Sequence, residues 1–299
     1  MKKTACVLFV FLLLTFFLSC PAAALEGARD GLILWFTQLL PALLPFCIIS
    51  YIVLASGLFQ SANKPKIHRG KISSLEWYII FCGFLFGFPI GCKLAMDSLH
   101  EGQISRKNAK ILACFANNLS PVFVTTALRE QLQLAVSPLP YFLLYGIPLI
   151  SGVLWLLLAR ESSAVQKKSA SRFQLNMQII DAGIMNGFET LIRICGYVMM
   201  FSIISKMIGM LPIGNEGIKI ILTGCLEVTN GIGLLAKADL TDSIKYLLAL
   251  VFLSWNGLSG LCQTASLLKR EGLPLMYYVK ARLLYTAGTG AAAAVLLLL

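Results

Sequence analysis

Charged side chains are scarce in this chain. Only 13% of its 299 residues are Asp, Glu, Lys or Arg, whereas 58% are hydrophobic. A soluble domain of this length needs far more charge to cover its surface with polar groups. The scarcity of charge therefore excludes an ordinary soluble protein.

Histidine is also scarce, and the cysteines show no metal-ligand spacing. The two histidines, His68 and His100, lie in separate polar stretches, and the nine cysteines are scattered through apolar segments without a CxxC pair. This pattern argues against a catalytic triad, a metal site and a disulfide framework. We therefore expect no enzyme, no metal and no cofactor, and we expect the cysteines to be small core residues.

Long charge-free runs, in contrast, fill most of the chain. A bilayer core needs ~20 apolar helical residues. Runs of 16 or more residues without charge are found at residues 32–59, 77–92, 111–128, 131–159, 246–268 and 283–299. The sequence thus predicts an all-α polytopic membrane protein in contact with the lipid bilayer.

The net charge of +11 comes mainly from basic residues in the loops between these runs. An excess of Lys and Arg in cytoplasmic loops accounts for such a distribution, so we expect no nucleic-acid partner. Residues 1–26 have a basic start, an apolar core and small residues before Leu25. They fit either a signal peptide or a first transmembrane helix.

Three short strings recur in the same order in the two halves of the chain. FCIIS (46–50) returns as FSIIS (201–205), GFPIG (87–91) has a counterpart in EVTNGIG (227–233), and NNLSPVFVT (117–125) returns as NGLSGLCQT (256–264). The pattern predicts two repeats, residues 27–159 and 182–299, joined by a polar cytoplasmic linker at residues 160–181.

Two of the apolar segments are short and interrupted. Residues 77–92 contain a Gly-Phe-Pro-Ile-Gly break, and residues 220–236 contain Glu227. If both are re-entrant, the basic loops at residues 60–76, 101–110, 160–172 and 269–271 fall on one side of the membrane. Each repeat then has three spans and one re-entrant segment, so the repeats are inverted, as in secondary transporters. Close helix packing through GFLFGFPIG is the alternative explanation.

Each repeat also contains a span that is interrupted by polar residues. ANNLSP places Asn117, Asn118 and Ser120 beside a proline, and WNGLSG places Asn256 and Ser259 beside glycines, with Gln263 one turn further on. A single amide of this kind is more often an interhelical hydrogen bond. Equivalent interruptions in both repeats favour a binding site, because the freed backbone groups need partners.

Lys93 and Glu227 are the charges nearest the two interruptions. The functional interpretation is that Lys93 contacts an anionic substrate near helix N-termini, while Glu227 binds a coupling proton or Na⁺. The alternatives are a Lys93–Glu227 ion pair, or a Lys93 side chain that reaches the inner headgroups. Glu189 and Arg193 are four residues apart, which predicts a structural pair on one helix.

The string GFPIGCKLAMDSLHEGQISRKNAKILACFANNLSPVFV, together with LEVTNGIGLL and GLSGLCQTASLL, resembles the YlbJ-type sporulation integral membrane proteins of the nucleoside-transporter-like Gate-domain superfamily. The resemblance covers about residues 27–290. Phe88 and Cys92 depart from the Tyr and Ala that are common in the family.

In the distantly related concentrative nucleoside transporters, substrate lies between re-entrant tips and two unwound helices. By position, the resemblance implies substrate contacts from both tips and both interrupted spans, with Glu227 as the coupling residue. The implied contacts are Gly87, Pro89, Gly91, Lys93, Asn117, Asn118, Ser120, Thr229, Asn230, Asn256, Ser259 and Gln263.

The resemblance also implies a function. YlbJ-type proteins are linked to sporulation and to the movement of dipicolinate, a planar dicarboxylate, across the outer forespore membrane. We therefore expect an integral membrane transporter for a small carboxylate. The alternatives are nucleoside or nucleobase transport, or a non-transporting membrane scaffold of the spore envelope.

Overall fold

The structure is a computed structural model that describes residues 2–58, 72–135, 137–159 and 174–298. All regular structure in these residues is helical, as the charge-free runs predicted. Four helical segments of this part of the chain are long and apolar enough to cross a membrane: Pro21–Ala55, Pro138–Leu158, Met177–Met210 and Asp242–Arg270. The expected all-α polytopic membrane protein is confirmed.

The first half of the chain contains a long helix, a helical hairpin, a broken helix and a second long helix. They are α2–η1–α3 (Pro21–Leu34, Trp35–Leu39, Leu40–Ala55), the hairpin α4 and α5 (Ser74–Leu85, Ile90–His100), the broken helix α6, α7 and η2 (Arg106–Phe115, Pro121–Thr125, Thr126–Gln131), and α8–η3–α9 (Pro138–Tyr141, Phe142–Gly146, Ile147–Leu158). Helix α1 (Lys2–Ser19) precedes them and packs beside α2 and α10 through Phe16, Ala24 and Ile203.

The second half repeats this order of elements. They are α10 (Met177–Met210), the hairpin α11 and α12 (Glu216–Leu226, Val228–Lys237), the broken helix α13 and α14 (Asp242–Trp255, Gly257–Arg270), and α15 (Met276–Leu298). The expected boundaries at residues 27 and 182 fall inside α2 and α10, because each opening helix begins several residues earlier. An inverted orientation of the two halves in the bilayer stays a prediction.

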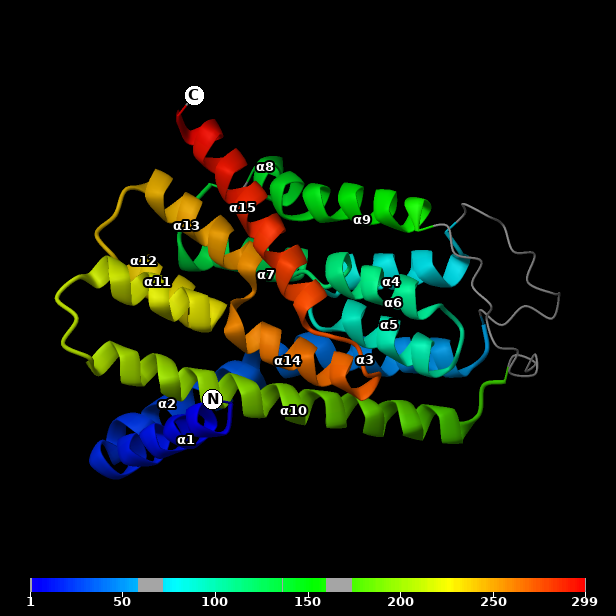
Figure 1. Cartoon of the computed structure of the whole chain (residues 1–299), viewed down its shortest axis with the longest axis horizontal. Coiled ribbons are helices and arrows are strands. Elements are labelled where there is room, and N and C mark those ends of the chain that lie inside the picture. Colours follow the sequence, from blue (N-terminus) through cyan, green and yellow to red (C-terminus); the bar gives the residue numbers. More distant parts are fainter. Residues whose placement is uncertain (1, 59–71, 136, 160–173, 299) are drawn as a thin grey trace.

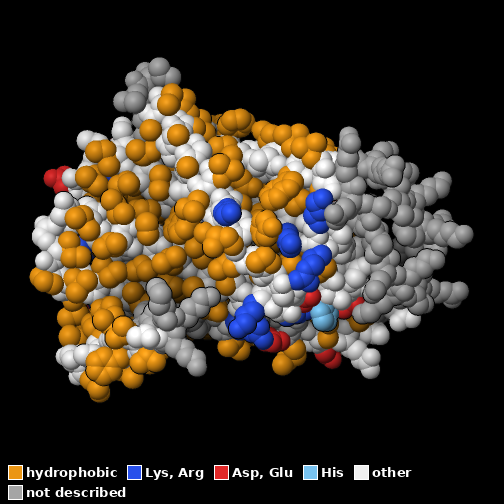
Figure 2. All heavy atoms as spheres, viewed as in Figure 1, with side chains coloured by type: hydrophobic (Ala, Val, Ile, Leu, Met, Phe, Trp, Pro, Cys, Tyr) orange, Lys and Arg blue, Asp and Glu red, His pale blue; other side chains and the backbone are white. Residues whose placement is uncertain are grey.

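The described residues at or beside the loops that the charge pattern assigned to one side of the membrane lie at one end of the molecule (Figure 1). Three hydrogen bonds join them: Gln174 N–H to the Ser56 carbonyl (3.1 Å), Lys107 Nζ to the Ala159 carbonyl (2.7 Å), and Arg106 Nη2 to the Gly272 carbonyl (2.5 Å). Lys and Arg side chains gather toward this end of the face in Figure 2, whereas hydrophobic side chains cover most of the rest. Most of the basic loops at residues 60–76 and 160–172 lie outside the described residues.

The first hairpin begins and ends at this same end. Asn108 Nδ2 donates to Glu76 Oε1 (2.6 Å), which ties the start of α4 to the start of α6. His100 at the end of α5 lies 3.2 Å from Glu271 in the turn before α15. The second hairpin begins and ends at the opposite end, where α10 stops and α13 begins (Figure 1). Each hairpin therefore enters the helix bundle from its own end and places its tip inside.

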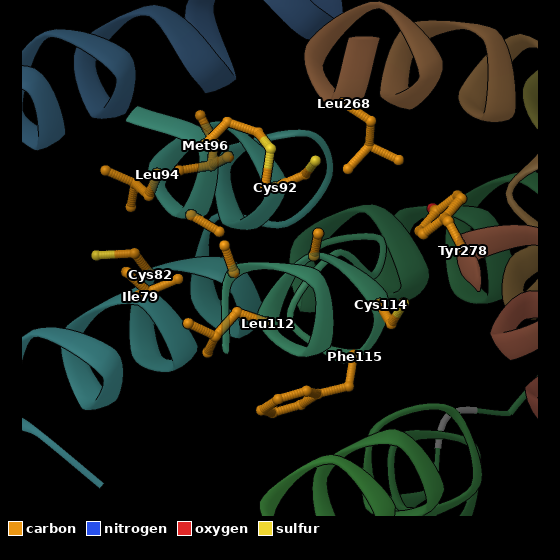
Figure 3. Close-up of a cluster of buried hydrophobic side chains, with 14 of the residues drawn as sticks. Ile79, Cys82, Cys92, Leu94, Met96, Leu112, Cys114, Phe115, Leu268 and Tyr278 are labelled. Atoms are coloured by element: carbon orange, nitrogen blue, oxygen red, sulfur yellow. The ribbon is translucent and has the colours of Figure 1, made fainter. Parts of the chain in front are cut away.

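Apolar side chains from both halves form the core around the first hairpin. Figure 3 shows Leu112 and Phe115 of α6, Leu268 of α14 and Tyr278 of α15 around it. Cys82, Cys92 and Cys114 are buried among them, as expected of small core residues. The expectation is wrong for Cys225, which is exposed, and holds only in part for the half-buried Cys20, Cys195 and Cys262. This packing fixes the hairpin against the broken helices, which is where the polar residues lie.

Candidate functional site

The tip of the first hairpin rests on the interruption of the first broken helix. Gly87 has a φ of +81°, and a Cβ at this position would overlap the backbone of Ser120. The Phe88 N–H donates to the Asn118 carbonyl (2.5 Å), one of the groups freed where α6 ends. Glycine is required here by both the backbone conformation and the close approach.

Glycines also bring the two helices of this hairpin together. A Cβ at Gly83 or Gly91 would overlap the carbonyl oxygen of Ala116, and each would lie 3.0 Å from the other glycine's Cα. Close packing, the alternative explanation of the glycine pattern, is therefore present. It accounts for Gly83 and Gly91 but not for the polar side chains around the tip.

The tip of the second hairpin meets the second broken helix in a similar way. Gly257 has a φ of +69°, and a Cβ there would lie 2.9 Å from the Leu226 carbonyl oxygen. Trp255 Nε1 donates to the Cys225 carbonyl (3.0 Å). Each tip thus packs on the broken helix of its own half.

The two tips differ in how the helix after the break is capped. In the second hairpin, Glu227 Oε2 accepts the Asn230 N–H (2.7 Å), so a carboxylate caps α12. In the first hairpin Pro89 is the N-cap residue of α5, and no side chain in the described part of the chain caps it. The positive end of the α5 dipole is therefore left without an anion.

The two broken helices cross at their interruptions. Asn256 Nδ2 donates to the Asn117 carbonyl (3.2 Å), and Asn117 Nδ2 donates to Thr264 Oγ1 and to the Tyr278 hydroxyl, both at 3.1 Å. Asn117 and Asn256, one from each interrupted span, are therefore in direct contact. Their amides bond to protein groups, as interhelical hydrogen bonds do.

Arg282 of α15, which was not among the residues predicted from the sequence, completes this crossing. Its side chain is 1% exposed and donates to Asn118 Oδ1 (3.0 Å), the Ser254 carbonyl (3.3 Å), the Tyr278 hydroxyl (3.0 Å) and the Asn117 carbonyl. In the described residues no carboxylate pairs with it. The guanidinium thus satisfies backbone carbonyls at or beside both interruptions. Its position one residue before an apolar run was the signal available in the sequence.

A cavity of about 200 Å³ lies beside the crossing, between the first hairpin, α10 and α14. Three of its lining residues are cations, Lys93, Arg193 and Arg270. The full lining is Pro89, Lys93, Asn186, Glu189, Thr190, Arg193, Ile194, Tyr197, Gln263, Ser266, Leu267 and Arg270. Two amide oxygens in this wall, Asn186 Oδ1 and Gln263 Oε1, are buried and have no hydrogen-bond partner in the described residues.

The charge partner of Lys93 is Asp97. Lys93 Nζ lies 2.6 Å from Asp97 Oδ2, one helical turn further along α5, and Asp97 Oδ1 lies 3.3 Å from Arg270. The alternative of a Lys93–Glu227 ion pair is wrong, because the carboxylate of Glu227 caps α12. The expected Glu189–Arg193 pair is present at 2.6 Å, but both residues line the cavity as well.

The sequence-predicted site residues are thus divided among three places. Pro89, Lys93 and Gln263 line the cavity, and Ser259 accepts from Gln263 Nε2 (3.2 Å) behind it. The backbone-packing and crossing residues are Gly87, Gly91, Asn117, Asn118 and Asn256.

The remaining predicted residues lie away from the cavity. Ser120 caps α7 by accepting the Phe123 N–H (3.2 Å), and Asn230 Nδ2 donates to Ser202 of α10 (3.2 Å). Thr229 is half-buried beside Glu227 on α12. In the described residues no group of three His, Cys, Asp or Glu side chains is placed to hold a metal ion.

Comparison with known proteins gives one informative match. The chain is 24% identical to the sporulation integral membrane protein YlbJ of Bacillus subtilis (strain 168), and the match covers 97% of this chain and 81% of the relative. No family model matches the chain, and no solved structure matches it. Because the similarity extends along nearly the whole of an all-helical membrane chain, the match supports a YlbJ-type assignment.

Proposed function

We propose that this protein is a secondary transporter, not an enzyme, and that it moves a small carboxylate such as dipicolinate across the outer forespore membrane. The observation that carries the proposal is the cavity that Lys93 shares with Arg193 and Arg270. Charged side chains among membrane-crossing helices are costly and usually mark the path of a substrate or ion. A cavity with three cations in its wall suits an anion.

The uncapped N-terminus of α5 adds to this preference for an anion. Pro89 and Lys93, from the first turn of this helix, both line the cavity. A carboxylate placed there would accept hydrogen bonds from first-turn N–H groups and pair with the Lys93 ammonium. It would occupy at the first tip the position that the Glu227 carboxylate occupies at the second.

The size of the cavity limits the substrate. Pockets for drug-sized ligands usually measure ~300–1,000 Å³, whereas this cavity measures about 200 Å³. A single small ring with one or two carboxylates is of the right scale. A peptide or a nucleotide chain is too large for the cavity in this conformation.

A nucleoside or nucleobase is the second candidate substrate. The unpartnered oxygens of Asn186 and Gln263 favour it, because amide groups in a pocket wall are suited to the donor and acceptor edge of a base. The same amides, with oxygen and nitrogen exchanged, would donate to a carboxylate. A competition experiment, in which a nucleoside and a small carboxylate compete for binding to the protein, distinguishes these two candidate substrates.

Glu227 is the proposed coupling group for a proton or Na⁺. Its side chain is buried at the second tip, and its carboxylate accepts a backbone N–H from Asn230. Buried acidic residues within membrane domains commonly take part in ion or proton pathways. In the described residues Glu227 is not part of the cavity wall, so it is suited to respond to an ion separately from substrate.

The proposal is tested in spores and in vesicles. Spores of a strain that lacks the protein should contain little dipicolinate, and vesicles that hold the purified protein should take it up. Uptake of a nucleoside in place of dipicolinate would favour the second candidate. Normal spore dipicolinate, together with no flux of any carboxylate or nucleoside, would contradict transport and favour a membrane scaffold.

A further inference from the structure

Asp97 forms ion pairs with two cations, Lys93 and Arg270, to which a substrate carboxylate would also bind. Its Oδ2 lies 2.6 Å from Lys93 Nζ, and its Oδ1 lies 3.3 Å from Arg270. The carboxylate therefore bridges two of the three cations that line the cavity, one from the first hairpin and one from α14. The side chain itself is 13% exposed and lies one helical turn behind Lys93.

The other cavity cations also have carboxylate partners. Arg193 pairs with Glu189 (2.6 Å), and Arg270 lies 3.3 Å from Glu271 as well as from Asp97. Lys93 differs from them because it is 3% exposed and Asp97 is its only carboxylate partner among the described residues. An anion that enters the cavity therefore competes with Asp97 for the charge of Lys93.

We infer that Asp97 is a resident counter-anion, which holds Lys93 and Arg270 in the empty site and is replaced there by the carboxylate of a bound substrate. The inference rests on the proposed function for the class of substrate. Competition with Asp97 would explain how the site selects one carboxylate over another. Asp97 is tethered one turn from Lys93, so its effective concentration is high and a weakly held monoanion cannot displace it.

A dicarboxylate can displace Asp97 more readily than a monocarboxylate can. Its two carboxylates are able to pair with Lys93 and with a second cation of the wall, Arg270 or Arg193, in one binding event. Replacement of Asp97 also removes the ion pair that connects α5 to α14. Substrate binding thereby frees the first hairpin from one of its contacts with the second half of the chain.

The test compares dipicolinate with picolinate, the same ring carrying one carboxylate, in equilibrium binding to the purified full-length protein. Wild type should prefer dipicolinate. Asp97→Asn should raise the affinity for picolinate by roughly tenfold, the value of one charge-assisted contact, and should narrow the preference. Glu271→Gln is the matched control, because Glu271 contacts Arg270 and His100 but not Lys93. It should change picolinate affinity by less than about threefold.

Each outcome decides the inference separately from the proposed function. If wild type binds dipicolinate and Asp97→Asn binds picolinate no more tightly, the inference is overturned and the function stands. If Asp97→Asn gains affinity for picolinate although wild type does not bind dipicolinate, the inference stands and the substrate assignment fails. If neither protein binds either anion, both are overturned.

If Asp97→Asn does not fold, a second variant can be used to test the inference. Arg270→Gln removes the half-exposed cation that Asp97 bridges, and leaves the Lys93–Asp97 pair in place. The preference for dipicolinate over picolinate should then fall at least threefold. An unchanged preference would overturn the inference.

Discussion

The two hairpin tips have similar surroundings but opposite electrostatic character. Each tip packs on a broken helix where a glycine has a positive φ. At the first contact this glycine is Gly87 of the tip, and at the second it is Gly257 of the broken helix. The second tip carries its own carboxylate, Glu227, on the N-terminus of α12. Among the described residues no side chain caps the first tip, which instead places Lys93 in a cavity. The difference indicates that the helix dipole at the second tip is already balanced by a carboxylate, whereas the first tip can accept an anion.

The prediction with the largest effect concerns Arg282, which both broken helices share. Arg282→Gln should lower the free energy of unfolding by ~3–5 kcal/mol, because it leaves the acceptors at the crossing without their charged donor. Thermal denaturation in detergent measures this. Arg193→Gln is the control, since its pair with Glu189 is more than half exposed and removing it should cost at most ~1 kcal/mol. Equal effects of the two variants would show that the crossing is not held by Arg282.

The second prediction contrasts the glycines of the two hairpins. Gly91→Ala should destabilise by ~1–3 kcal/mol, because the new methyl group meets the backbone carbonyl of Ala116. Gly233→Ala in α12 meets no atom within 4 Å and should stabilise by ~0.5–1 kcal/mol through helix propensity. Opposite shifts in melting temperature are therefore expected. Shifts of the same sign would contradict the close packing of the first hairpin.

The third prediction concerns the open tip. Lys93→Met should weaken dipicolinate binding roughly ten- to a hundredfold, the loss of one charge-assisted contact at ~1.5–3 kcal/mol. Lys93→Arg should rescue it only in part, because the guanidinium is larger and planar. Lys110→Met is a control of the same chemistry, since Lys110 lies over the Tyr277 ring outside the cavity. Titration calorimetry of the three variants would reveal whether the effect belongs to Lys93 alone.

The smallest expected effect on stability belongs to the closed tip. Glu227→Gln keeps an oxygen that can cap α12 and loses only the charge, so it should destabilise by ~0.5–1 kcal/mol. If Glu227 couples transport to an ion, this variant should still exchange substrate across vesicles but no longer accumulate it against a gradient. Retention of ion-driven accumulation would remove Glu227 from the coupling role.

The interruptions were predictable from sequence because each depends on local chemistry. Pro89 with its flanking glycines, and Glu227 inside an apolar segment, mark places where a membrane helix cannot continue without other partners. The internal repeat marked Asn117 and Asn256 as equivalent positions, and the structure brings them into contact. The Lys93–Asp97 pair is also visible in the sequence as an i, i+4 spacing, whereas the partner considered for Lys93 was Glu227 at the other tip.

Other parts of the site depend on contacts between distant segments. Arg282 contacts Asn118, 164 residues earlier in the chain, and nothing in the local sequence selects that partner. Similarly, Glu189 and Arg193 form the expected helical pair, yet only the packing of α10 against the first hairpin and α14 places them in a cavity wall. Sequence thus predicted where the helices are interrupted, and tertiary packing determined which side chains meet there.

The most direct test of an anion site at the first tip is uptake of radiolabelled dipicolinate into vesicles that contain the purified protein. Wild type and Lys110→Met should show equal, saturable uptake, and Lys93→Met should show almost none while it inserts and folds normally. Uptake by Lys93→Met at the wild-type rate would contradict the account, because the substrate would then cross the membrane without the charge that the cavity provides.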